Sequence, residues 1–275
     1  MDGNRYWYFD IGANRFGDNN PNNVPPDPRF RNNAIRTAKY TAISFLPLNF
    51  WHQVTKGLNL YYLATCVLQL IPAISHSGGK PLNLPPLIII ILISMIKDFI
   101  EDLRRRKADD EENDRKVTRL IAKSSNGTQY EEVKWKDLKT GEIVILKNKE
   151  FFPADLVMLR SSAPKNICYV ETKSLDGETN LKEKLAPKVV FERFKTVAQL
   201  EEELRGTVKC EAPHDQIYRF EGVMDLADKT KISLTLDNFL LRGSRLKNTE
   251  WIYGVVTHTG HDTRIMRNSV NSKQK

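Results

Sequence analysis

Glu171-Thr172-Lys173-Ser174-Leu175-Asp176-Gly177-Glu178-Thr179-Asn180-Leu181-Lys182 is a stretch that places one carboxylate directly after a glycine and directly before a hydroxyl. This order suits the handling of a phosphoryl group. Gly177 permits a positive φ and a close approach of the backbone to a ligand. Glu178 carries a carboxylate that can take a proton from water, and Thr179 offers a hydroxyl and an amide. The same residues also fit an exposed hairpin turn, which Asp-Gly favours, so the surrounding sequence has to decide.

Two apolar stretches stand in the first half of the chain, at residues 58–74 and 82–99. With their flanks, each approaches the roughly 20 residues that cross a bilayer as a helix. The connector between them, residues 75–81, contains two glycines and a proline that end one helix and permit a reversal. The pattern therefore predicts a transmembrane helical hairpin.

Basic residues flank this hairpin on both outer sides, at residues 29–39 and 104–107. Because basic residues favour the cytosolic side of a membrane, both outer ends are predicted to be cytosolic and the connector to face the lumen or the exterior. A buried hairpin in the core of a soluble protein is the alternative, and the paired basic flanks argue against it.

The composition, 40% hydrophobic and 28% charged with a formal net charge of +8, fits a membrane protein with a large soluble part. The densest basic cluster, residues 104–107, is followed at once by the acidic residues 109–112, which would repel a nucleic acid. Anionic lipid headgroups explain that cluster better, so no nucleic-acid partner is expected. Three widely spaced cysteines, Cys66, Cys168 and Cys210, have no metal or disulfide spacing and are expected to be reduced packing residues.

Residues 1–35 come before the hairpin and are predicted to form a polar, mobile tail rich in Asn and Pro.

Turn-separated β-like runs dominate the second half of the chain. One helix is predicted over residues 197–204, which contain strong helix formers. Short strands at this density indicate a β-sandwich or jelly-roll. The predicted strands are residues 117–122, 143–147, 156–159, 168–172, 232–236 and 251–257.

Several further segments match one known family in order and spacing. They are residues 33–41 leading into Phe45-Leu46-Pro47-Leu48-Asn49, then Phe151-Phe152-Pro153-Ala154-Asp155-Leu156, residues 240–251, and Thr259-Gly260-His261-Asp262-Thr263. Together with the Glu178 stretch, they resemble the amino-terminal portion of the phospholipid-transporting P-type ATPases, the lipid flippases. The resemblance implies a mixed fold, in which a transmembrane α-helical hairpin is joined to a mostly-β actuator domain, a distorted jelly-roll.

The implied domain organisation has three parts. Residues 1–35 are the mobile tail, and residues 36–104 hold the segment leading into the membrane and the hairpin, with spans at about 56–75 and 82–102. Residues 105–275 are expected to form the cytosolic actuator domain.

The resemblance also implies roles for the residues of the loop. Glu178 would orient and deprotonate the water that attacks an aspartyl phosphate, and the backbone around Gly177 with Thr179 would stabilise the phosphoryl oxygens. Asp176 is expected to shape the turn. Asn180 is expected to fix the loop through a bond from its side chain to the backbone.

The phosphate-accepting aspartate of these pumps lies in an Asp-Lys-Thr-Gly-Thr motif beyond the fourth membrane helix. The triplet Asp228-Lys229-Thr230 mimics its start, but Lys231 stands where glycine is required, so a surface turn is expected. The chain alone is therefore expected to be inactive and to bind no cofactor or metal. ATP and Mg²⁺ are implied for the complete pump, through its other domains.

Polar side chains at intervals of three, four and three mark one face of the first predicted span. They are Asn59, Tyr62, Cys66 and Gln69. One interpretation is that Gln69 and Asn59 border the path of a lipid headgroup, because polar groups in a bilayer need partners or water. The other is that they hydrogen-bond to neighbouring helices.

The implied partners are a phospholipid substrate, the membrane, the remaining pump domains and a two-span accessory subunit. The implied location is a multi-pass position in a eukaryotic Golgi, endosomal or plasma membrane, with both ends of this chain cytosolic. A reading from another class also fits the sequence, namely a membrane-anchored β-domain that acts as a non-catalytic binding or regulatory module. A piece of a cation pump is disfavoured, because the first apolar stretch contains no acidic residue and the second contains one only at its next-to-last position, Asp98.

Overall fold

The computed structural model describes residues 6–11, 32–41, 43–72, 78–124 and 127–272. The chain divides into two compact units, the β unit (residues 1–35 and 113–275) and the helical unit (residues 36–112). It leaves the β unit after Ile35 and returns to it at Asn113.

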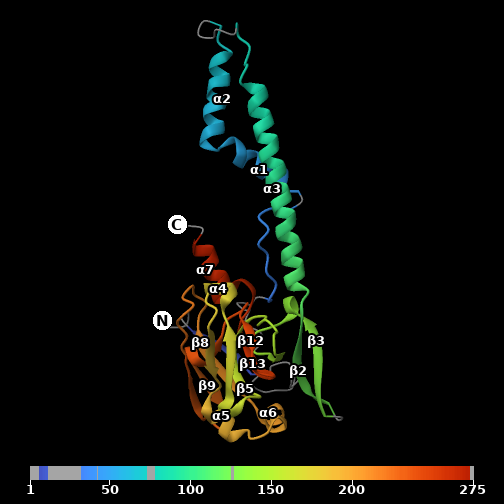
Figure 1. Ribbon diagram of the computed structural model, residues 1–275, viewed down its shortest axis with the longest axis vertical. Helices are drawn as coiled ribbons and strands as arrows, with labels where there is room; N and C mark the ends of the chain where they lie inside the picture. Colours follow the sequence, from blue (N-terminus) through green and yellow to red (C-terminus); the bar gives the residue numbers. More distant parts are fainter. Residues whose placement is uncertain (1–5, 12–31, 42, 73–77, 125–126, 273–275) are drawn as a thin grey trace. The chain divides into compact units, whose positions relative to one another are not determined.

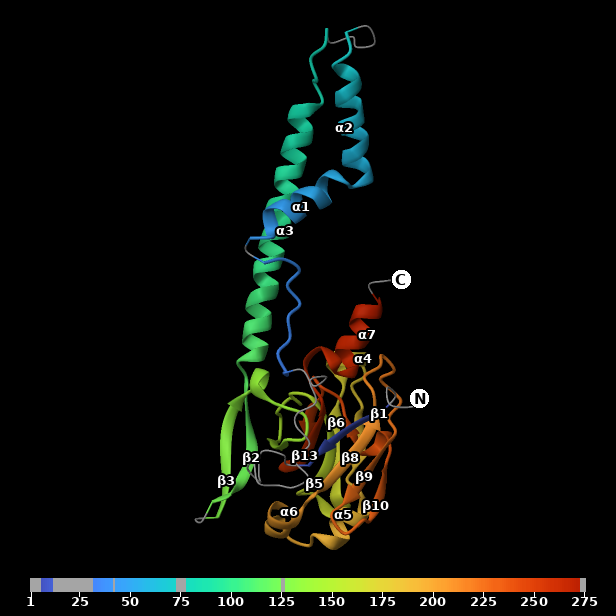
Figure 2. The ribbon, with the colours of Figure 1, turned by 180° about the vertical axis from the view of Figure 1, so that it is seen from behind.

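Thirteen strands in the described residues build three antiparallel sheets in the β unit (Figures 1 and 2). Their bounds are β1 Tyr6–Asp10, β2 Lys116–Ser124, β3 Gly127–Lys134, β4 Ile143–Lys147, β5 Asp155–Ser161, β6 Ile167–Glu171, β7 Leu181–Leu185, β8 Gly206–Glu211, β9 Gly222–Leu226, β10 Lys231–Leu234, β11 Phe239–Leu240, β12 Arg245–Lys247 and β13 Trp251–His258. The sheet orders are β11-β5-β13-β4-β2-β3, β1-β8-β9-β10 and β12-β6-β7. The predicted mixed fold with a mostly-β second half is confirmed.

The central strands of the six-stranded sheet are buried on both faces. Along β5, Leu156 and Met158 belong to one apolar core, whereas Val157 and Leu159 belong to the other. Successive side chains of a strand point to opposite faces, so this nearly continuous apolar strand packs two cores at once. Four of the six predicted strands lie within observed ones, and the predicted strands 168–172 and 232–236 overlap β6 and β10 but extend one and two residues past their ends.

The three cysteines are free and buried, each in a different apolar cluster. Cys210 lies in the core that contains Val157, Cys168 in the core that contains Leu156, and Cys66 in the helical unit. Burial raises the pKa of both Cys168 and Cys210 to about 12. They therefore pack as small apolar residues, as predicted.

Four α-helices of the β unit lie at its two ends (Figure 1). Figure 1 shows α4 (Lys173–Asp176) and α7 (Arg264–Ser272) at one end and α5 (Lys188–Arg193) and α6 (Val197–Glu203) at the other. Helix α6 is the helix predicted from residues 197–204. It begins with a capping box in which Thr196 and Gln199 each satisfy the other's backbone amide.

The first strand corrects the prediction of a polar tail over residues 1–35. Residues Tyr6–Asp10 form β1, which pairs along its whole length with β8. Its alternate residues Trp7 and Phe9 are buried in the core, and only this non-local pairing reveals their role. Residues 12–31, also assigned to the tail, lie outside the described residues.

The helical unit contains α1 (Phe45–Val54), α2 (Gly57–Gln69) and most of α3 (Leu84–Asn113). Helix α2 ends earlier than the predicted span, because Pro72 disfavours helical backbone at the residue before it. Helix α3 runs past the predicted span, since i,i+4 ion pairs such as Arg106 with Asp102 support its charged second half. No helix in the described part of the chain is both long and apolar enough to cross a membrane.

A segment of extended chain, residues 35–40, is held by polar side chains of α3. Asp109 accepts hydrogen bonds from the amides of Thr37 and Ala38 at 2.7 and 3.1 Å, and Asp102 accepts from the amide of Lys39 at 2.8 Å. Within the β unit, Ile35 and Asn113 exchange two hydrogen bonds of 2.8 Å between backbone and side chain.

Candidate active site

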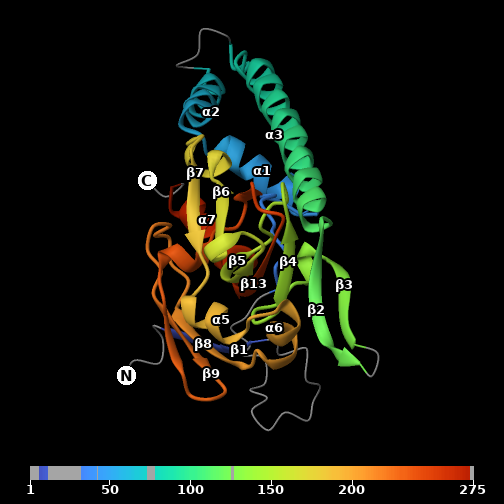
Figure 3. The ribbon, with the colours of Figure 1, turned by 60° about the horizontal axis from the view of Figure 1, so that its bottom comes forward.

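The loop with Glu178 joins two paired strands. Strands β6 and β7 lie side by side (Figure 3), and their last pair at this end is Glu171 with Leu181. Residues 173–176 make the single helical turn α4, which Gly177 ends at a φ of 76°. This left-handed conformation is costly for residues with a Cβ atom and cheap for glycine, so the sequence folds locally as a tight reversal.

The carboxylate of Asp176 organises the reversal from inside. It accepts hydrogen bonds from the hydroxyl of Thr172 at 2.9 and 3.1 Å and from the amide of Glu178 at 3.0 Å. It also forms an ion pair with Lys182 Nζ at 2.5 Å. The Lys182 ammonium lowers the pKa of Asp176 to about 2, helped by the Glu178 amide and the Thr172 hydroxyl. Asp176 therefore stays ionised and fixes the backbone of the loop.

Glu178 and Thr179 lie exposed beyond this turn. The side chain of Glu178 is 59% exposed, and its carboxylate lies 3.1 Å from Lys182 Nζ. An exposed carboxylate on a fixed backbone is available to a substrate brought from outside the loop. Asn180 is exposed as well, and among the described residues no side-chain hydrogen bond of Asn180 is found. The side chain that bonds the loop backbone is Asp176, which corrects the expectation for Asn180.

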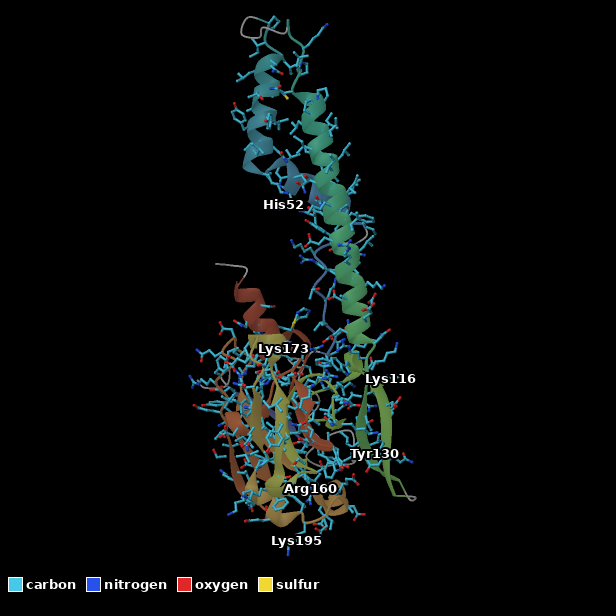
Figure 4. The ribbon with its side chains drawn as sticks, in the orientation of Figure 1. His52, Lys116, Tyr130, Arg160, Lys173 and Lys195 are labelled. Atoms are coloured by element: carbon cyan, nitrogen blue, oxygen red, sulfur yellow. The ribbon has the colours of Figure 1, made fainter. Side chains whose placement is uncertain are left out.

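The loop is attached to the turn between β11 and β12. Ser174 Oγ donates a hydrogen bond of 2.9 Å to the carbonyl of Gly243. Gly243 has a φ of 78°, and a Cβ atom there would lie 3.6 Å from Leu175. Figure 4 places Lys173, the first residue of α4, at one end of the β unit and Arg160 and Lys195 at the other.

A largely apolar pocket of about 120 Å³ lies next to the loop. Its lining includes Asp176 and Lys182, and further residues from β6, β7, β11 and the segment between β8 and β9. Lys184 also lines it and donates a hydrogen bond of 2.7 Å to the carbonyl of Leu236. Burial lowers the pKa of Lys184, because the uncharged amine is favoured where water is scarce.

Asp228-Lys229-Thr230 forms the exposed turn between β9 and β10, as predicted. Lys229 adopts a positive φ of 67°, and Asp228 accepts a hydrogen bond from the amide of Thr230 at 3.1 Å. The Asp228 carboxylate pairs with Arg193. These contacts are those of a surface turn that is paired with the end of α5.

The two polar residues of the first predicted span differ in their surroundings. Asn59 is buried and donates a hydrogen bond of 2.8 Å to the carbonyl of Gln53, in the last turn of the adjacent helix α1. Gln69 is half-buried and accepts a hydrogen bond of 3.3 Å from the amide of Asn83. Asn59, Tyr62, Cys66 and Gln69 are all less exposed than most of α2, in agreement with a shared face.

Two residues that line the pocket next to the loop, Lys182 and Tyr218, were missed by the sequence analysis. In the sequence analysis, Lys182 was given no role. A basic residue this close in sequence to two carboxylates could have indicated an ion pair. Tyr218, whose ring centroid lies 5.6 Å from Lys182 Nζ, comes from a distant segment and left no local signal. In the described residues, no group of three or more His, Cys, Asp or Glu side chains is placed to hold a metal ion.

Comparison with known families matches both parts of the chain. Residues 14–80 match the family described as phospholipid-translocating ATPase N-terminal, and residues 113–269 match the P-type ATPase actuator domain. The second match covers more than half of the chain and contains the loop with Glu178.

Curated relatives agree with these family matches. A phospholipid-transporting ATPase of Schizosaccharomyces pombe is 40% identical over 247 residues, which is 90% of this chain and 19% of the relative. Phospholipid-transporting ATPase IK of Homo sapiens is 40% identical over 240 residues, 87% of this chain and 18% of the relative. Phospholipid-transporting ATPase 10 of Arabidopsis thaliana is 38% identical over 246 residues, 90% of this chain and 20% of the relative. The chain thus spans about a fifth of the length of these relatives.

Proposed function

This chain belongs to the phospholipid-transporting P-type ATPases, and we propose that its actuator domain supplies the loop that dephosphorylates the aspartyl-phosphate intermediate of a lipid-translocating pump. The observation that supports this role is the geometry of one carboxylate. Glu178 is 59% exposed, yet its backbone amide is fixed by Asp176 and the residue before it provides a left-handed turn.

The proposed step is an attack by water on the acyl phosphate. Glu178 takes a proton from the water while the water oxygen bonds to phosphorus. The bond from phosphorus to the aspartyl oxygen breaks, so inorganic phosphate and a free aspartate result. Positioned general-base catalysis of this kind contributes typically 10²–10⁴-fold to a rate. Gly177 leaves room for the phosphoryl oxygens, since a Cβ atom there meets nothing within 4 Å, and Thr179 supplies an amide and a hydroxyl as donors.

We also propose that α2 and the apolar first half of α3 lie in the membrane and border the path of the phospholipid. Many large apolar side chains of these helices are exposed in this structure, among them Leu58, Leu60, Val67, Ile89 and Ile93. Such a surface is stable only when lipid or other membrane helices cover it. Gln69, half-buried near the end of α2, is the proposed contact of the headgroup. ATP and Mg²⁺ would act through other domains of the complete pump.

The test is Glu178→Gln in the full-length pump that carries this segment. Glutamine keeps the size of the side chain and removes its basicity. Phosphorylation by ATP should survive, and the phosphoenzyme should persist at least roughly 10²-fold longer in the presence of substrate lipid. Glu192→Gln is the matched control, because Glu192 is also an exposed partner of a lysine four residues away. Normal dephosphorylation by the Glu178 variant would reject the role and favour a non-catalytic actuator module.

A further inference from the structure

The side chain of Glu178 is too exposed to be oriented by packing, so another group has to orient its carboxylate. Its backbone is fixed by Asp176, but its side chain has three rotatable bonds and is mostly in solvent. Among the described residues, the one ion-pair partner found for its carboxylate is Lys182, at 3.1 Å. The orientation of the carboxylate therefore depends on how well Lys182 is itself fixed.

Lys182 is held from three directions. Its backbone pairs with Val170 in the β6–β7 ladder, one pair before the ladder ends at the loop. Its ammonium forms the 2.5 Å ion pair with Asp176, which is only 13% exposed, and lies 5.6 Å from the ring of Tyr218. The side chain is 31% exposed, half as much as that of Glu178. Hydrogen bonding to Asp176 raises the pKa of Lys182, so the ammonium stays charged.

Asp176, Lys182 and Glu178 thus form a chain of contacts, in which the fixed ammonium of Lys182 links the fixed carboxylate of Asp176 to the exposed carboxylate of Glu178. Each contact is an opposite-charge hydrogen bond, which is stronger than a neutral one and has a preferred geometry. We propose that Lys182 is the positioning residue of the dephosphorylation loop. It holds the Glu178 carboxylate in the orientation from which it receives the proton of water. This inference rests on the proposed function of Glu178.

The test compares dephosphorylation rates in the full-length pump. Lys182→Met removes the ammonium and should slow loss of the phosphoenzyme roughly five-fold, the rate equivalent of ~1 kcal/mol for a partly exposed ion pair. Lys182→Arg keeps a cation able to bridge two carboxylates and should stay within about two-fold of wild type. Lys188→Met should change nothing, because its i,i+4 pair with Glu192 lies in α5 at the opposite end of the β unit (Figure 1). Normal phosphorylation by ATP reports that each variant is folded, and Lys182→Gln is the substitute if the methionine variant is not.

A double-mutant cycle separates positioning from the other roles of a lysine. If Lys182 acts through the Glu178 carboxylate, Lys182→Met should add no further slowing to Glu178→Gln. The same five-fold slowing in both backgrounds would overturn the inference, since Lys182 would then act on the phosphate or on the fold of the loop. Full activity of Lys182→Met would overturn it as well, while leaving the role of Glu178 intact. Normal dephosphorylation by Glu178→Gln would overturn the proposed function and this inference together.

Discussion

The side-chain oxygen of Asn33 accepts a hydrogen bond of 2.8 Å from the backbone amide of Gly260, across 227 positions of the sequence. The same oxygen accepts from Arg242 at 2.8 Å, while the amide nitrogen donates to the carbonyls of Trp135 and Pro153. Asn33 is fully buried. One asparagine before the helical unit therefore satisfies four separate groups inside the β unit.

Asn33→Ala should destabilise the β unit by roughly 2–4 kcal/mol, because it leaves buried donors and acceptors without partners. Chemical denaturation followed by tryptophan fluorescence measures this change in the free energy of unfolding. The control is Asn32→Ala, at an exposed position, which should stay within about 0.5 kcal/mol of wild type. Equal effects of the two variants would show that the buried hydrogen bonds of Asn33 add nothing to the free energy of unfolding beyond what an exposed asparagine contributes.

Gly177→Ala should cost about 1 kcal/mol through backbone conformation alone. The φ of 76° disfavours an L-residue, but an added Cβ atom would meet nothing within 4 Å. Gly177→Asn should recover much of the loss, since asparagine tolerates the left-handed region. Gly57→Ala, equally free of contacts but without a positive φ, is the control. Dephosphorylation of the full-length pump should fall in the alanine variant and recover in the asparagine variant.

His258 should make the β unit sensitive to acid. Burial lowers its pKa to about 3, against about 6.5 in an unfolded chain. As the pH falls below 6.5, His258 of the unfolded chain binds a proton, whereas the buried ring of the native protein stays neutral. Stability present above pH 6.5 is therefore lost progressively toward pH 3, at up to about 1.4 kcal/mol per pH unit. His258→Gln should flatten this slope in denaturation curves between pH 6 and 4, and an unchanged slope would contradict the assignment.

Thiol labelling can test the proposed membrane topology. The three cysteines of this chain are buried, so they should contribute little background labelling. Lys80→Cys, at an exposed position between α2 and α3, should react with an impermeant reagent applied to the non-cytosolic side. Lys188→Cys, in the actuator domain, should react only after the membrane is permeabilised. Reaction of both variants from the same side of intact membranes would exclude the hairpin.

Gln69 and Asn59 should respond differently to substitution by leucine. Asn59 is buried against the carbonyl of Gln53, so Asn59→Leu should lower the thermal stability of the pump. Gln69 is half-buried, so Gln69→Leu should leave stability nearly unchanged and raise the lipid concentration needed for half-maximal dephosphorylation several-fold. Equal lipid dependence in wild type and Gln69→Leu would remove Gln69 from the lipid path.

Structural features that depend on residues close together in the sequence could be predicted. Strand β4, helix α6 and the turn at Asp228 follow from local periodicity, helix propensity and turn chemistry, and the structure has all three. The reversal at Gly177 was visible for the same reason. The ends of α2 and α3 were less accurate, since helix ends depend on capping and on the residues beyond them.

Non-local partners could not be read in this way. Strand β1 was taken for part of a tail because its pairing partner, β8, begins 200 residues later. Asn33 was noted only as part of a motif, and the acceptors and donors around it come from four separate segments. The contact of Tyr218 with Lys182 likewise exists only once β7 and the segment after β8 are folded.

The paired hydrogen bonds between Ile35 and Asn113 mean that the helical unit is an insertion whose two ends already meet. Closing a loop costs little entropy when its ends are held together by the host fold. The β unit is thus a complete fold into which residues 36–112 are inserted at a single point. A short glycine linker from Ile35 to Asn113 could therefore replace residues 36–112, and the remaining β unit would keep all thirteen described strands and both apolar cores.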